Sequence, residues 1–111
     1  MKANDLTTHF MLYSDGTTGK PRPIYIADIH NKEALVYKIT SQFEHKSKTV
    51  KSKYFEIKDW KITGLKKQSW IDTYSDPIWL PLTTLKTSFG HLSNQDILAF
   101  HKFIQLNSLD Y

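Results

Sequence analysis

The single arginine of the chain, Arg22, stands between Pro21 and Pro23 at the end of a loop that contains two glycines. Each proline fixes its own φ angle, and Pro23 also restricts Arg22 to extended backbone. A guanidinium presented from such stiff backbone is suited to clamp an anion through two hydrogen bonds. Lysine lacks this planar fork, and every other Lys/Arg cation of the chain is a lysine. An arginine that caps a sheet edge or pairs with a carboxylate would fit the same sequence.

A second polar segment, Ile39-Thr40-Ser41-Gln42, ends a run of β-branched and aromatic residues that begins at Ala34. A similar run spans residues 24–29, and the polar connection 30–33 between the two is short enough for a hairpin. Antiparallel pairing would bring Arg22 and Thr40 to the same end of that hairpin. Hydroxyl and amide groups beside a guanidinium can bind a phosphate and orient a hydroxyl. A Thr-Ser pair at a strand end is otherwise common turn chemistry.

Residues 45–53 place lysines and one histidine between small polar residues, which predicts a flexible cationic loop. Such a loop is either a solvated hairpin tip or a segment that follows phosphates. In the second case Lys46 and Lys48 would each add salt-dependent affinity without sequence preference.

Other catalytic centres find no support in the sequence. The chain has no cysteine, which excludes disulfides, thiolate metal sites and a cysteine nucleophile. The histidines show no metal-ligand spacing, and residues 15–20 lack the full spacing of a phosphate-binding loop. A Ser-His-Asp hydrolase would need a larger scaffold and a nucleophile elbow. We therefore expect no metal and no cofactor.

Length and charge restrict the class of protein. A chain of 111 residues corresponds to a single domain, 1–111, and 40% hydrophobic residues can supply its core. The net charge of +4 favours an anionic partner. The first residues hold no apolar run of a signal peptide, and no segment approaches the roughly 18 apolar residues of a membrane span. We expect a cytoplasmic protein that does not contact membranes.

Short strands followed by one helix are predicted to position the polar segments. Beside the two hairpin runs, further strand candidates with recurring turn signals suggest a small barrel or sandwich: 9–13, 54–57, 69–73 and 83–87. A helix is predicted over about 94–106, with Ser93 as its N-cap and Asp96 at its third position. Its apolar face is predicted from helical spacing to hold Ile97, Leu98, Phe100, His101, Phe103 and Ile104. The fold class is mainly β, with strands over about 9–89.

The chain resembles a known family, the MazF/PemK toxins of type II toxin–antitoxin systems. Gly19-Lys20-Pro21-Arg22-Pro23 before a β-run and the segment 39–42 are similar to the two signature segments of that family. Residues 54–57, 64–71 and 89–93 agree in order, so the resemblance covers roughly residues 16–105. The resemblance implies an SH3-like small barrel with a C-terminal helix, usually a homodimer. It also implies an mRNA interferase, a sequence-specific and metal-independent endoribonuclease for single-stranded RNA.

By position, the resemblance implies that Arg22 and Thr40 are the catalytic residues. The ribose 2′-hydroxyl would attack the adjacent phosphate, expel the 5′-oxygen and leave a 2′,3′-cyclic phosphate. Arg22 would stabilise the charge of the phosphorane. Substrate binding is expected from Gly19, Lys20, Ser41, Gln42, Lys46 and Lys48. The group that takes the 2′-proton stays unassigned.

The resemblance also implies binding partners, and two segments of the chain depart from the family pattern. A cationic toxin is expected to be held by an acidic, partly disordered antitoxin, with which this family also binds DNA. Residues 6–13 and 74–82 depart from the family pattern. Trp70, Tyr74 and Trp79 either stack unpaired bases or pack in the core or a dimer interface. A catalytically silent SH3-like module that binds nucleic acid or a peptide is the alternative function.

Overall fold

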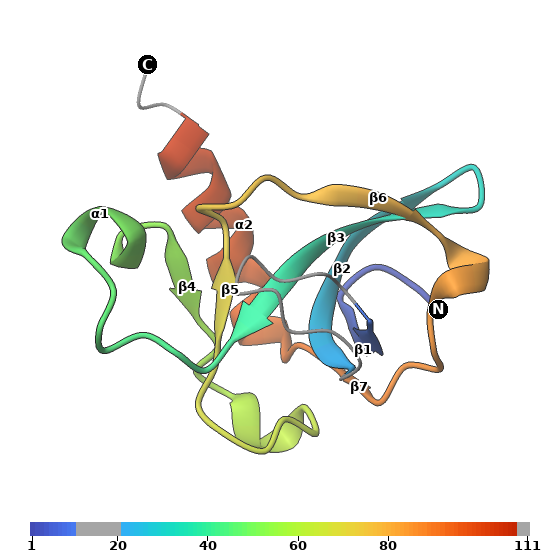
Figure 1. Cartoon of the computed structure of the whole chain (residues 1–111), viewed down its shortest axis with the longest axis horizontal. Helices are drawn as coiled ribbons and strands as arrows, with labels where there is room; N and C mark the ends of the chain where they lie inside the picture. Colours follow the sequence, from blue (N-terminus) through green and yellow to red (C-terminus); the bar gives the residue numbers. More distant parts are fainter. Residues whose placement is uncertain (11–20, 109–111) are drawn as a thin grey trace.

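The computed structural model describes residues 1–10 and 21–108, in which a bent sheet carries one long helix (Figure 1). The elements in chain order are β1 (Asp5–His9), β2 (Arg22–His30), β3 (Glu33–Thr40), α1 (Lys48–Lys51), β4 (Tyr54–Glu56), the 3₁₀ turn η1 (Trp60–Ile62), β5 (Trp70–Asp72), β6 (Ile78–Pro81), the 3₁₀ turn η2 (Leu82–Thr84), β7 (Gly90–His91) and α2 (Asn94–Ser108).

The strands form one antiparallel sheet in the order β4-β5-β3-β2-β1-β7. Strand β3 has three partners: β2 on one side, and β6 and then β5 along the other. The mainly β fold with a C-terminal helix is confirmed. The sheet is not closed, however, because β4 and β7 end the path without pairing with each other among the described strands. The expected small barrel is therefore an open, bent sheet in this chain.

The predicted hairpin is present, and it forms because the backbone twist of its turn matches the twist of the two strands. Asn31 and Lys32 both have positive φ angles, 50° and 67°, which match the twist of a two-residue hairpin. The pairing places Ile24 opposite Lys38, with a bulge between Ile26 and Asp28. Continuing this register by two residues puts Arg22 across from Thr40. The hairpin therefore places both residues at its open end, as predicted.

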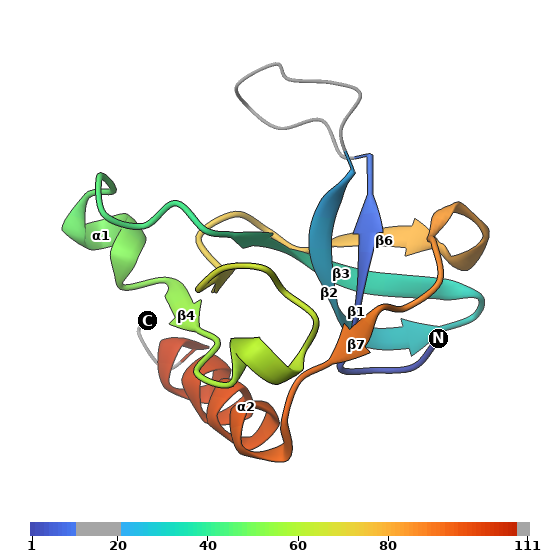
Figure 2. The ribbon, with the colours of Figure 1, turned by 90° about the horizontal axis from the view of Figure 1, so that it is seen from below.

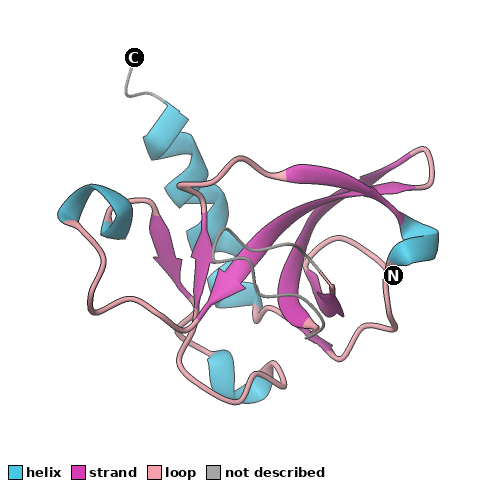
Figure 3. Cartoon of the chain, in the orientation of Figure 1, coloured by secondary structure: helices cyan, strands magenta, loops and turns pink. Residues whose placement is uncertain are grey.

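The core has two parts because successive side chains of β2 and β3 alternate between the sheet faces. One face packs against α2, where the Phe55 and Phe100 rings lie 5.2 Å apart. Figure 2 shows α2 below β4 and η1, and Figure 3 shows it beside β4 and β5. The other face holds Ile24, Ile26, Ala34 and Val36, which Leu80, Leu82 and Leu85 partly cover.

Helix α2 begins where the sequence indicates. The Asp96 amide donates to Ser93 Oγ at 3.1 Å, which confirms the predicted N-cap. The buried Asp96 carboxylate accepts from the amides of Lys58 (3.3 Å) and Asp59 (2.9 Å), so it ties the helix start to the loop after β4. Leu98 and His101 are exposed, contrary to the predicted apolar face, because Ile97, Phe100, Phe103 and Ile104 already fill the contact with the sheet.

Three predicted elements need correction. The first strand spans Asp5–His9, so it ends where it was predicted to begin, and residues 11–13 lie outside the described part of the chain. No strand forms over 83–87; the nearby strand is β6, hidden in the sequence by Pro77 and Pro81, which an edge strand tolerates. The lysine segment is partly helical, since Ser47 Oγ accepts from the Val50 amide and caps α1.

Candidate functional site

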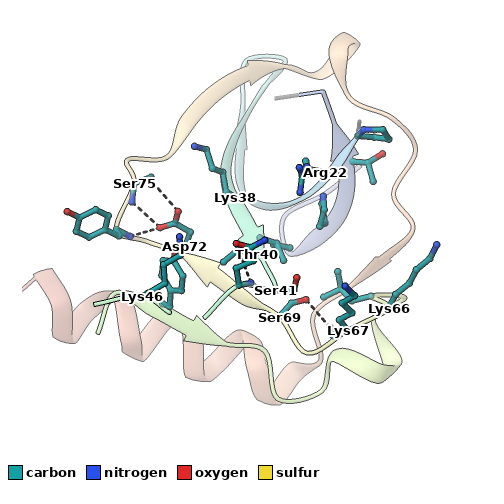
Figure 4. A pocket seen from close by; sticks show the side chains of 18 of the residues that line it. Arg22, Lys38, Thr40, Ser41, Lys46, Lys66, Lys67, Ser69, Asp72 and Ser75 are labelled. Carbon is teal, nitrogen blue, oxygen red and sulfur yellow. Dashed lines mark hydrogen bonds between the residues drawn. The ribbon is translucent and has the colours of Figure 1, made fainter. Parts of the chain in front are cut away.

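A pocket of about 900 Å³ opens at the end of the β2–β3 hairpin (Figure 4). Among the predicted site residues, Arg22, Thr40, Ser41, Gln42 and Lys46 all line it. Lys48 is exposed on α1 and does not line this pocket. Gly19 and Lys20 lie outside the described residues. Most of the predicted site residues therefore line one pocket at the end of the hairpin.

Arg22 and Thr40 occupy the ends of two paired strands. Arg22 begins β2, where His9 of β1 is its opposite residue, and Thr40 ends β3 opposite Trp70 of β5. Both side chains are half-buried. Pairing with β1 therefore holds the Arg22 backbone and pairing with β5 holds the Thr40 backbone, at neighbouring ends of β2 and β3 in the pocket wall.

The Thr40 hydroxyl has a defined role in hydrogen bonding. The Gln42 amide donates to Thr40 Oγ1 at 3.0 Å. Because this bond uses an oxygen lone pair, the hydroxyl proton stays available to donate to a bound anion. Ser41 and Gln42 are exposed beside it, so their polar groups can reach the same ligand.

An aromatic stack anchors the loop that follows Thr40. The Phe43 and Trp70 rings are parallel to within 7°, with centroids 4.5 Å apart, and Lys51 Nζ lies 4.9 Å from the Phe43 centroid. The Phe43 carbonyl also accepts from the Lys46 amide at 3.1 Å. Phe43 therefore fixes the backbone on both sides of it, from the Gln42 amide to Lys46. Trp70 is only 9% exposed and belongs to the core, which favours the packing alternative for this residue.

The pocket is strongly cationic. Lys38, Lys66 and Lys67 line it together with Arg22 and Lys46. Sequence reasoning did not assign these three lysines to the site, although Lys66 and Lys67 form a dibasic pair just before β5. Their loop is held locally, since the Thr63 hydroxyl donates to the Trp60 carbonyl and accepts from the Leu65 amide. The resulting field favours a ligand with several negative charges.

One corner of the pocket is acidic. Asp72 ends β5 and is only 8% exposed. Its Oδ1 accepts from the amides of Tyr74 (2.9 Å) and Ser75 (3.0 Å), and its Oδ2 accepts from Ser75 Oγ at 3.1 Å. Burial and then the Asp72 charge raise the pKa of Tyr54, the residue opposite Asp72, so this phenol stays neutral. Tyr74 is 57% exposed and also lines the pocket, whereas Trp79 lies on β6 outside it.

Comparison with known proteins identifies the fold. No family model and no curated protein matches the sequence. In structure, the chain is similar to Mycobacterium tuberculosis toxin MazF-mt6, with a TM-score of 0.65 over 94% of this chain and 96% of that chain, at 18% identity. The chain has the MazF fold. Within residues 1–10 and 21–108, no helix has the length and apolar character needed to cross a membrane.

Proposed function

We propose that this chain is the toxin of a type II toxin–antitoxin system and cleaves single-stranded RNA in a sequence-specific, metal-independent reaction. The observation that carries the proposal is that Arg22 and Thr40 line the same pocket. They lie at neighbouring ends of the paired strands β2 and β3, and lysines surround them. The fold it shares with a MazF toxin supports the same function. The proposal includes a cytoplasmic homodimer, and an acidic antitoxin that complements the net charge of +4.

The proposed reaction is an internal transesterification at phosphorus. The ribose 2′-hydroxyl gives up its proton and its oxygen bonds to the phosphorus, while the bond from phosphorus to the 5′-oxygen breaks. The leaving 5′-oxygen takes up a proton, so the net transfer is one proton from the 2′-oxygen to the 5′-oxygen. Two N–H groups of Arg22 stabilise the charge that builds on the non-bridging oxygens. Thr40 donates its hydroxyl proton to the same phosphate, while Ser41 and Gln42 orient it. Lys38, Lys46, Lys66 and Lys67 hold the neighbouring phosphates.

The proposal is tested by incubating the purified protein with long single-stranded RNA in EDTA. We expect discrete fragments with 2′,3′-cyclic phosphate ends, and the Thr40→Val variant to cut much more slowly because it keeps the shape but loses the hydroxyl. RNA that is bound but left intact across varied sequences would contradict the nuclease and favour a silent binding module.

A positioning effect is expected from Phe43. The Phe43→Ala variant should lower kcat for RNA cleavage about tenfold with a smaller change in KM, because it frees the Gln42 amide that orients the Thr40 hydroxyl. Phe43→Tyr retains the stack and should restore most of the rate. Steady-state cleavage of a fluorescent RNA measures both constants, and an equal loss in the alanine and tyrosine variants would argue against positioning through the ring.

A further inference from the structure

The acidic corner of the pocket lies across β3 from Arg22. In the sheet, β3 stands between β2, which begins with Arg22, and β5, which ends with Asp72. Figure 4 shows Thr40 between Arg22 on one side and Asp72 with Ser75 on the other. The register of β3 with β5 continues to Asp72 opposite Lys38, two residues along β3 from Thr40. Two strand spacings combined with this offset amount to roughly 12 Å. A nucleotide whose phosphate contacts Arg22 and Thr40 can therefore reach this corner with its base.

The corner presents hydrogen-bond acceptors in a pocket whose other charged lining residues, in the described part of the chain, are cations. Two backbone amides occupy Asp72 Oδ1, whereas Oδ2 accepts one bond, from Ser75 Oγ. A carboxylate oxygen has two lone-pair positions, so Oδ2 can accept one bond more. These local bonds also fix the carboxylate in place. Such a preorganised acceptor selects for a ligand N–H group.

We propose that Asp72 and Ser75 form a nucleobase subsite for a base that carries an exocyclic amino group, and that this subsite rejects uracil. The inference rests on the proposed RNA cleavage. Adenine, cytosine and guanine each offer an amino N–H to Asp72 Oδ2. Uracil offers one ring N–H flanked by two carbonyl oxygens, which the carboxylate repels. The exposed Tyr74 ring at the pocket wall provides a surface on which the base stacks.

The Asp72→Asn variant is the sharpest test because it replaces one hydrogen-bond acceptor, Oδ2, with a hydrogen-bond donor. Its side-chain oxygen still accepts from the Tyr74 and Ser75 amides, while its NH₂ group replaces the acceptor Oδ2 with a donor. Asp76→Asn is the matched control, since Asp76 is exposed and loses the same charge four residues away. The assay is cleavage of a randomised single-stranded RNA library, followed by sequencing of the cut ends.

For the wild type and Asp76→Asn, we expect uridine to be depleted about tenfold at one position next to the cut. In Asp72→Asn that depletion should disappear or reverse at this position alone. Persistence of the depletion in Asp72→Asn, or no such position in the wild type, overturns the subsite. Absence of any cleavage by the wild type would instead contradict the proposed function.

A binding measurement separates the subsite from catalysis. Fluorescence anisotropy with 2′-O-methyl oligomers of uridine and of cytidine avoids cleavage, because the attacking hydroxyl is blocked. The wild type should bind the cytidine oligomer about tenfold more tightly, and Asp72→Asn should not. If Asp72→Asn fails to fold, Asp72→Ser replaces it, because a serine hydroxyl can also accept the turn amides. Unchanged base preference in the folded variant overturns the inference.

Discussion

Replacing Arg22 by alanine is expected to lower RNA cleavage by roughly 10²–10³-fold, the usual effect of removing a preorganised donor from a developing anion. Most of the loss should fall on kcat, because the lysines that line the pocket continue to bind the RNA phosphates. Arg22→Lys should recover only part of the rate, since an ammonium group replaces the planar guanidinium, which can donate two parallel hydrogen bonds. Single-turnover cleavage of a defined RNA measures these differences.

Lys102→Ala is the control for net charge, because Lys102 is exposed on α2 outside the pocket and its loss changes the charge equally. That variant should cut RNA at close to the wild-type rate. A folded Arg22→Ala protein, judged by thermal unfolding, is required for the comparison. If Lys102→Ala and Arg22→Ala reduce the rate alike, the effect of Arg22 is general electrostatics and its assignment to the phosphorane is wrong.

The largest expected effect on stability comes from Gly90, where β7 meets the loop after η1. A Cβ at Gly90 would lie 1.8 Å from the Thr63 carbonyl oxygen and 2.8 Å from its carbonyl carbon. Both are backbone atoms, and Thr63 is buried and hydrogen-bonded within its own loop. Gly90→Ala should therefore lower the free energy of unfolding by about 3 kcal/mol. For a domain of this size, the melting temperature should fall by roughly 10–20 °C.

His91→Ala is the matched control on the same strand, because the His91 side chain is exposed and its loss should leave the melting temperature almost unchanged. Circular dichroism melts of the three proteins make the comparison. Gly90→Ala should also slow RNA cleavage at temperatures where it is folded, since the displaced loop carries Lys66 and Lys67 into the pocket. A Gly90→Ala protein as stable as the wild type would show that the Thr63 loop can move aside without lowering the free energy of unfolding.

The parts that sequence predicted correctly depend on local interactions. The hairpin register follows from the two-residue turn at Asn31 and Lys32, and that register brings Arg22 to Thr40. The start of α2 follows from Ser93, whose hydroxyl acts three residues along the chain. In both cases the deciding contacts join residues close in sequence, so their pattern is visible without knowledge of the rest of the fold.

The parts that sequence missed depend on contacts between distant segments. Strand β6 exists because it pairs with β3 more than forty residues earlier, as in Leu80 opposite Ala34, and no strand was predicted for this segment, which contains Pro81 and follows Pro77. The Asp72 corner was not predicted because it joins the site only through the pairing of β5 with β3. Lys38, Lys66 and Lys67 were missed for the same reason. Lysine is common in this chain, so composition alone could not single them out.

The pairing of β1 with β7 makes the order of synthesis matter. Asp5 lies opposite His91, so the first strand gains its second neighbour only after residue 91 has left the ribosome. The hairpin that bears Arg22 and Thr40 is complete much earlier. The loop with Lys66 and Lys67 packs against Gly90, which arrives late. A growing chain thus has Arg22 and Thr40 side by side long before it has the pocket, and a chain that stops before Gly90 lacks the contact that holds the Lys66 and Lys67 loop.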